Sequence, residues 1–181
     1  MVTKELEWIS EMCKHEGLEV KRVRKSGETL LGGYFKGKRA RNFVDSKVVG
    51  VNSCDPESKR KIRREYLLLM KNASRKDYRE FIWEALSLNW IDEKIKMIVD
   101  EIGEYGEVGT LYKTILIETY MKEKSLKGDD LYRACGCGRS TYFSRKVEAV
   151  TLFGILTYRY ALRREKEDIA TGVVDATERL A

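Results

Sequence analysis

The chain has 181 residues, of which 43% are hydrophobic and 35% charged, and its formal net charge is +6. This composition is too apolar for a disordered chain and too charged for a membrane protein. No window approaches the roughly 18 consecutive apolar residues that a transmembrane helix needs. The first ten residues carry acids where a secretory signal needs a basic tip and an apolar run, so we expect a cytoplasmic protein without a membrane partner.

The residue composition of the N-terminal part of the sequence changes at Gly17. Residues 3–16 place Leu6, Ile9 and Met12 at helical spacing, which predicts a helix that ends at Gly17. Residues 18–51 are rich in glycine, β-branched and aromatic residues, which predicts two to four short strands with a turn at Ser26–Gly27.

Positive charge is concentrated in this β-like segment. Residues 21–41 contain eight Lys and Arg residues against one acid, Glu28. Such a concentration is typical of polyanion-binding proteins. The segment is interpreted either as a basic arm that lies on a DNA duplex or as a solvated basic loop with no defined partner.

The middle of the chain predicts helices. Asp55 and Pro56 resemble an N-cap followed by proline at the first helical position, which opens a helix to about residue 71. Ser74 and Asp77 have capping-box spacing, and a helix with an apolar stripe at Phe81, Ile82, Ala85 and Leu88 is expected after them. A further helix is expected over about 91–102, followed by a glycine-rich turn over 103–109.

The last third has the order of a helix-turn-helix motif. A helix over about 110–123 precedes a short helix that starts at Asp129, a tight turn over 136–138, and a long amphipathic helix from Arg139. The fold class expected is therefore mainly α, a helical bundle with a C-terminal helix-turn-helix and a small basic β element near the N-terminus. We divide it into an N-terminal helix plus basic segment (1–54), a helical middle (55–107) and a DNA-binding region (108–181).

Catalytic and metal sites find no support in the sequence. Cys135 and Cys137 are spaced more tightly than the usual Cys-x2-Cys zinc knuckle, and no second ligand pair follows them. His15 is the single histidine and has no nucleophile near it in the sequence. We therefore expect no metal, no cofactor and no enzymatic activity, and we interpret the two cysteines as small apolar side chains beside the turn.

The stretch DLYRACGCGRSTYFSRKVEAVTLFGI, residues 130–155, carries a family resemblance. It resembles the C-terminal helix-turn-helix of phage late-gene transcriptional regulators of the ArpU/RinA type, a domain similar to sigma-factor region 4. Tyr132 departs from that pattern, since a small alanine usually stands there. The resemblance implies control of late-gene transcription, with RNA polymerase and a second copy of the chain considered as further partners.

The spacing of apolar residues after Arg139 suggests which face of this helix would read DNA. If Phe143, Val147 and Val150 face inward, then Ser140, Thr141, Ser144, Arg145 and Glu148 face outward. Arg145 suits a bidentate contact to guanine, whereas Lys146 suits a phosphate. The residues expected to contact DNA are Arg139, Ser140, Thr141, Tyr142, Ser144, Arg145 and Lys146 in this helix, and Lys21, Arg22, Arg24, Lys25, Lys36, Lys38, Arg39 and Arg41 in the basic segment.

The function expected from these features is sequence-specific binding of double-stranded DNA, as a phage-type transcriptional regulator. The alternative is a DNA-packaging subunit of the small-terminase kind, which also uses a helix-turn-helix but assembles into a ring. A surface amphipathic helix in an unrelated all-α protein would explain the same periodicity without DNA.

Overall fold

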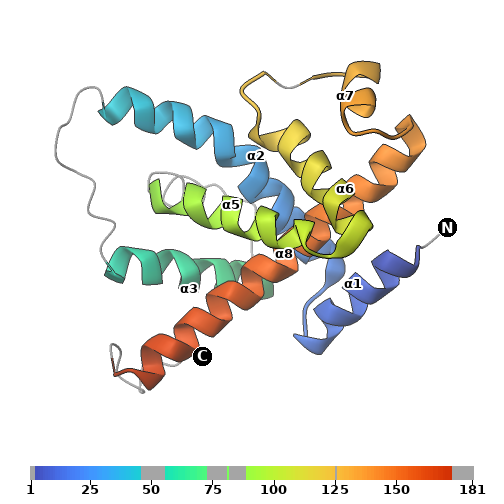
Figure 1. The fold of residues 1–181 in the computed structure, drawn as a ribbon. Helices are drawn as coiled ribbons and strands as arrows, with labels where there is room; N and C mark the ends of the chain where they lie inside the picture. The colour runs from blue at the N-terminus through green and yellow to red at the C-terminus, as the bar shows by residue number, and fades with distance from the viewer. Residues whose placement is uncertain (1–2, 46–55, 73–80, 82–88, 125, 173–181) are drawn as a thin grey trace.

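The protein is a bundle of helices (Figure 1). The computed structural model describes residues 3–45, 56–72, 81, 89–124 and 126–172, with the backbone alone for 35–45, 72 and 89. Within these residues every regular element is helical, which confirms the mainly α class. The elements are α1 (Lys4–His15), α2 (Val20–Asp45), α3 (Pro56–Asn72), α5 (Asn89–Gly103), α6 (Gly106–Leu116), the π-helical segment η1 (Ile117–Met121), α7 (Asp129–Ala134) and α8 (Arg139–Ala170).

The long helix α8 is the centre of the bundle. All eleven residues from Glu148 to Tyr158 are buried, so this stretch is covered on every side. Helices α1, α2, α3, α5 and α6 all pack against it (Figure 1). A helix that is buried all round is a core helix rather than a surface one. The N-terminal end of α8, residues 139–147, extends beyond this covered stretch toward α7.

Helix α1 forms where the sequence predicts it. The hydroxyl oxygen of Thr3 accepts a hydrogen bond from the amide of Leu6 at 3.2 Å and caps the first turn. Ile9, Met12 and Cys13 point into the core. Gly17 follows the helix with a φ of 69°, a conformation that side chains with a Cβ rarely adopt.

The strands expected in residues 18–51 are not formed over 20–45, and this prediction is wrong. These residues form the single helix α2, while 46–51 lie outside the described residues. Val23, Leu30, Leu31 and Tyr34 are buried, and their spacing is that of one helical face. The predicted turn at Ser26–Gly27 is likewise absent, because both residues are in the helix interior and buried.

The glycines that suggested turns instead allow two helices to approach closely. A Cβ added to Gly27 would lie 2.6 Å from the carbonyl oxygen of Val150 on α8, and one added to Gly154 would lie 2.5 Å from the carbonyl oxygen of Val23 on α2. Each helix therefore places a glycine against the backbone of the other. Burial of the α2 face against α8 outweighs the weak helix propensity of glycine here.

The remaining helices match the prediction closely. Helices α3 and α5 occupy the expected ranges, and α6 with η1 covers the helix expected over 110–123. The glycine-rich turn is shorter than expected, because α6 already begins at Gly106, whose φ is 72°. The helix expected after Ser74 lies outside the described residues apart from Phe81, which is helical and buried.

One large hydrophobic core joins the three regions of the chain. It includes Ile9 and Leu31 from the N-terminal region, Met70 and Ile98 from the middle, and Phe153 from α8. Burial of this much apolar surface is the main stabilising term for such a bundle. In the described part of the chain, no helix is both long enough and apolar enough to cross a membrane.

Candidate nucleic-acid interface

Helix α7 ends at a glycine cap that turns the chain into α8. Gly136 has a φ of 66°, and its amide donates to the carbonyl of Arg133 at 3.0 Å. The amide of Cys137 donates to the carbonyl of Tyr132 at 3.1 Å. This pair of bonds satisfies the last carbonyls of α7 and requires a left-handed residue, which glycine supplies without strain.

A second hydrophobic cluster holds α7 against its neighbours. Its buried members are Ile115 from α6, Cys135 from the turn and Tyr142 from α8, and Leu111, Leu131, Tyr132 and Cys137 pack against them. The two cysteines therefore act as apolar side chains, as expected from the sequence. Burial raises the pKa of the Cys135 thiol to about 11. Among the described residues, no group of three His, Cys, Asp or Glu side chains could hold a metal, and Cys54 lies outside these residues.

The prediction of which α8 residues face inward is wrong in its first turns. Phe143 is 49% exposed, whereas Tyr142 is buried and its hydroxyl lies 2.9 Å from the hydroxyl of Thr119. Glu148, expected at the surface, is 1% exposed. The sequence has aromatic residues at both 142 and 143, and α8 is buried all round from residue 148, so apolar periodicity could not choose between the two faces.

Arg145 belongs to a half-buried polar network between α8, α1 and α6. Its guanidinium donates to Glu148 at 2.9 Å and lies 3.2 Å from the carboxylate of Glu5 on α1. Glu148 also accepts hydrogen bonds from the hydroxyls of Thr3 and Tyr112. Burial lowers the pKa of Arg145, but the hydrogen bonds to Glu148 and Glu5 outweigh burial and raise it above its usual value. The arginine expected to read guanine thus joins α8 to α1 and α6.

Lys146 also makes a contact within the protein. It is half-buried, and its ammonium lies 5.2 Å from the centre of the Tyr120 ring, which places it over an aromatic face. Tyr120 belongs to η1, so this contact joins the start of α8 to the π-helical segment. Arg145 and Lys146 therefore both make intramolecular contacts on the side of α8 that faces the bundle.

The exposed residues at the start of α8 are Arg139, Ser140, Thr141, Phe143 and Ser144. Four of these are polar residues that the sequence singled out, and the fifth is the aromatic residue that it placed inside. Phe143 makes edge contacts with Tyr142 and with Tyr132, at centroid distances of 5.2 Å and 6.0 Å. Tyr132 thus fits beside the turn by packing its ring on the two aromatic residues of α8.

The first turn of α8 has no side-chain cap. Gly138 stands at the N-cap position, no side chain accepts a hydrogen bond there, and the first turn contains no acid. The amides of this turn are left without a side-chain acceptor, in a region where the helix dipole favours an anion. Arg139 is exposed in this turn and adds a positive charge there, whereas Arg145 and Lys146 are directed at the protein. A phosphate group at this helix start would therefore meet favourable charge from both the backbone and Arg139.

In Figure 1, α2 starts in the middle of the bundle and runs toward the side opposite α7. Lys21 and Lys25 are exposed, Arg24 is half-buried, and the guanidinium of Arg22 donates to the carbonyl of Lys71 at 2.6 Å. The side chains of Lys36, Lys38, Arg39 and Arg41 lie outside the described ones. The predicted basic arm is therefore a helix that belongs to the bundle.

Comparisons with known proteins do not assign this arrangement to a family. No protein-family model, no curated protein and no solved structure matches the chain.

Proposed function

We propose that the chain binds double-stranded DNA with sequence preference and uses the start of α8 as its reading helix. The observation that carries this proposal is the exposed face formed by Arg139, Ser140, Thr141 and Ser144 directly after the glycine cap. Short hydroxyl side chains let a helix approach base edges closely, and they donate to or accept from either bases or phosphates.

The proposal divides the work of the exposed residues by their chemistry. Arg139, at the uncapped helix start, contacts a backbone phosphate together with the first-turn amides. Ser140 and Ser144 lie one helical turn apart and face the base edges. Phe143 lies beside them, held by two aromatic rings, and contacts the methyl group of a thymine.

The rest of α8 suits this role by making the reading helix rigid. The same helix continues into the core from Glu148 onward, so its exposed start is fixed in orientation by the whole bundle. Arg145 adds to this through its contacts with Glu5 and Glu148. We therefore assign Arg145 to positioning the helix rather than to reading a base.

The biological role proposed is transcriptional regulation of the phage late-gene kind, which rests on the sequence resemblance of residues 130–155. RNA polymerase is considered as a further partner for this role. A DNA-packaging role would need a ring, so the mass of the purified protein in solution separates the two roles. A monomer or dimer fits a regulator, and a closed ring of many subunits would contradict it.

The decisive experiment is selection of bound fragments from a random DNA library with the full-length protein, followed by footprinting. An enriched motif is expected, and recovery of no motif would contradict sequence-specific binding. The Ser140→Ala and Ser144→Ala variants should lose base preference at individual positions, by about 0.5–1.5 kcal/mol for a single hydrogen bond. Arg139→Ala should weaken all sequences alike and reduce the slope of log K against log salt by about 0.9. Lys96→Ala, an exposed position on α5, is the matched control and should change neither quantity.

A further inference from the structure

Trp8 and Tyr105 form an exposed aromatic pair that the proposed DNA-reading surface does not use. Trp8 on α1 is 45% exposed, and Tyr105, at the turn between α5 and α6, is 41% exposed. Their ring centroids lie 5.6 Å apart, and the ring planes are tilted by 56°. Single exposed apolar side chains are ordinary on a protein surface, whereas adjoining ones with a polar rim are typical of interaction sites.

Both rings are carried by well-packed parts of the bundle. Trp8 directly precedes Ile9, which is fully buried in the core. The amide of Tyr105 donates to the carbonyl of Ile102 at 3.2 Å, and its carbonyl accepts from the amide of Gly109 at 3.4 Å. Gly109 also lets α6 approach closely, since a Cβ there would lie 2.8 Å from the Cβ of Tyr105. The pair is therefore already formed, and a partner would not have to order it.

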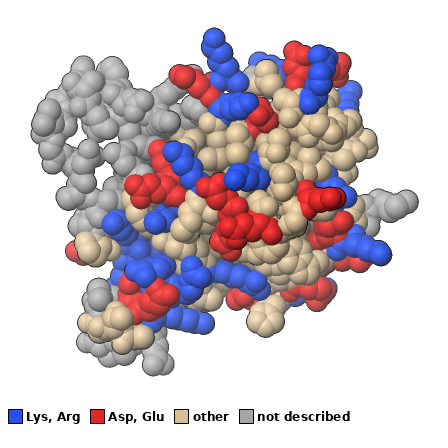
Figure 2. Space-filling view, viewed as in Figure 1, with Lys and Arg blue, Asp and Glu red and all other residues tan. Residues whose placement is uncertain are grey.

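Carboxylates border the pair on the side of Tyr105. Burial raises the pKa of the Tyr105 hydroxyl, and Glu101 and Glu104 raise it further, which places both negative charges near this ring. Arg159 acts on the same hydroxyl in the opposite direction, but its guanidinium donates to Glu16 at 2.9 Å. Glu101 and Glu104 are exposed, and neither has an ion-pair partner in the part of the chain that the structure describes. In Figure 2, acidic side chains lie over the region where Figure 1 places α5 and the adjoining part of α1.

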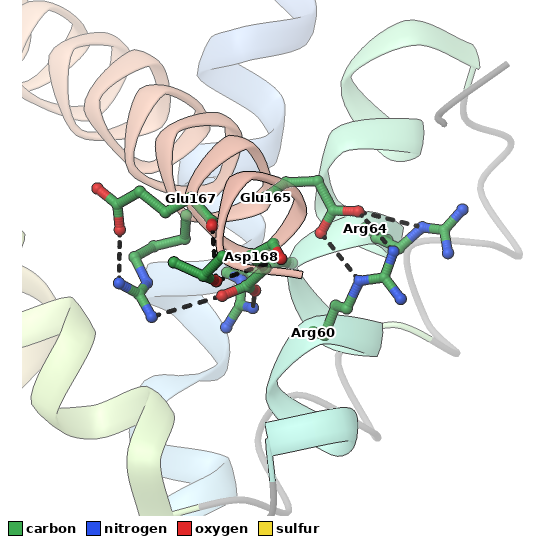
Figure 3. Close-up of polar contacts among 8 residues, drawn as sticks. Arg60, Arg64, Glu165, Glu167 and Asp168 are labelled. Atoms are coloured by element: carbon green, nitrogen blue, oxygen red, sulfur yellow. Dashed lines mark hydrogen bonds and ion pairs between the residues drawn. The ribbon is translucent and has the colours of Figure 1, made fainter. Parts of the chain in front are cut away.

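Two acids elsewhere in the bundle show the contrast, because each has a cation within the chain. At the C-terminal end of α8, the buried Glu165 accepts from Arg60 at 2.9 Å and lies 3.9 Å from Arg64 (Figure 3). Asp100, which is on α5 itself, pairs with Lys113 at 2.7 Å. The formal net charge of the chain is +6, so a surface with unpaired carboxylates is a local departure from its overall charge. The carboxylates beside the aromatic pair thus favour a cationic occupant.

We propose that Trp8 and Tyr105 bind an arginine-bearing segment of a partner protein. The planar guanidinium stacks on the exposed aromatic faces, and the attraction comes from the charge distribution of the rings. Glu101 and Glu104 supply the countercharge, and they repel the phosphates of a nucleic acid from this surface. The inference uses none of the residues assigned to DNA, so it does not depend on the proposed function.

Binding of a dye-labelled hexa-arginine peptide to the full chain, followed by fluorescence anisotropy, tests this surface. The same peptide with citrulline, an uncharged isostere of arginine, should bind far more weakly, and hexa-lysine should bind about two-fold more weakly or less. Trp8→Leu keeps an apolar side chain but removes the ring, so it should weaken binding of hexa-arginine by about two- to five-fold, and so should Tyr105→Leu. Replacing both Glu101 and Glu104 by Gln should weaken it by about two- to five-fold as well.

Glu93→Gln is the matched control for charge, since Glu93 is an exposed acid of the same helix and lies about 12 Å along α5 from Glu101. It should leave the affinity unchanged, because exposed charges at that separation are largely screened at about 0.1 M salt. Equal affinity of the wild type, Trp8→Leu and Tyr105→Leu for hexa-arginine would overturn the inference, and so would equal binding of the arginine and citrulline peptides. Size-exclusion chromatography gives a further check: a wild-type dimer that is lost in Trp8→Leu would overturn the inference, because a second copy of the chain would then cover this surface.

Discussion

The crossing of α2 over α8 provides a sharp test of the fold. In Gly27→Ala, the new methyl group would lie 2.6 Å from the carbonyl oxygen of Val150 and 3.3 Å from a methyl group of the same residue. Ordinary contact begins near 3.4 Å, so the two helices must separate. Gly154→Ala meets the same obstacle from the other side, 2.5 Å from the carbonyl oxygen of Val23.

The magnitude follows from two opposing terms. Alanine is favoured over glycine in a helix interior by about 0.8–1.0 kcal/mol. Overpacking costs about 1–3 kcal/mol, and the upper value applies because the contacted atoms belong to rigid backbone. The net loss in unfolding free energy is therefore about 2 kcal/mol. For a chain of this length, Tm should fall by about 4–8 °C.

Gly32→Ala is the matched control, because it makes the same substitution in the same helix. Gly32 is exposed, and a Cβ there would meet nothing within 4 Å. Only the propensity term remains, so this variant should gain about 0.5–1 kcal/mol. Chemical and thermal unfolding followed by far-ultraviolet circular dichroism measures all three variants. If Gly27→Ala is stabilised as Gly32→Ala is, the close approach of α2 and α8 is not real.

The other predictions concern α8 and its partners. Arg145→Ala should lower the unfolding free energy by about 1–3 kcal/mol, because it removes a partner of the buried Glu148, and it should leave base preference on a selected site unchanged. A changed base preference with an unchanged Tm would instead show that Arg145 reads a base. Phe143→Ala and replacement of thymine by uracil in the selected site should each weaken binding by about 1 kcal/mol and should not add in combination, whereas additive losses would show that Phe143 does not touch the thymine methyl. Replacing both Cys135 and Cys137 by alanine should leave DNA binding intact with a modest loss of Tm, and chelators should not alter the melting of the wild type; stoichiometric zinc lost on chelation would contradict this. Glu165→Gln should destabilise the chain by about 3 kcal/mol, as Arg60 and Arg64 lose their shared charge, whereas the exposed Glu167→Gln should cost less than 1 kcal/mol; equal costs would mean that the buried pairs do not anchor α8 to α3.

The helices that the sequence determined by itself are those with local signals at both ends or a clear apolar stripe. An apolar stripe and Gly17 mark α1, Pro56 begins α3, and the glycines around Cys137 separate α7 from α8. These signals act through backbone conformation within a few residues, so they do not depend on the rest of the fold. The outward position of Ser140, Thr141 and Ser144 was also predicted, but from an inward face that included Phe143, which is exposed.

Tertiary structure decided the features in which one residue type can serve two purposes. Glycine in a β-like composition suggests a turn, but Gly27 and Gly154 serve close packing between α2 and α8, two helices that are far apart in sequence. The periodicity of α8 could not fix its facing, because a helix covered on all sides has no single apolar stripe. Arg145 looked available for DNA because Glu5 lies 140 residues earlier in the chain. The partner of Arg145 in the bundle is set by how α1 packs on α8. A charged side chain can be assigned to a ligand only once its neighbours in space are known.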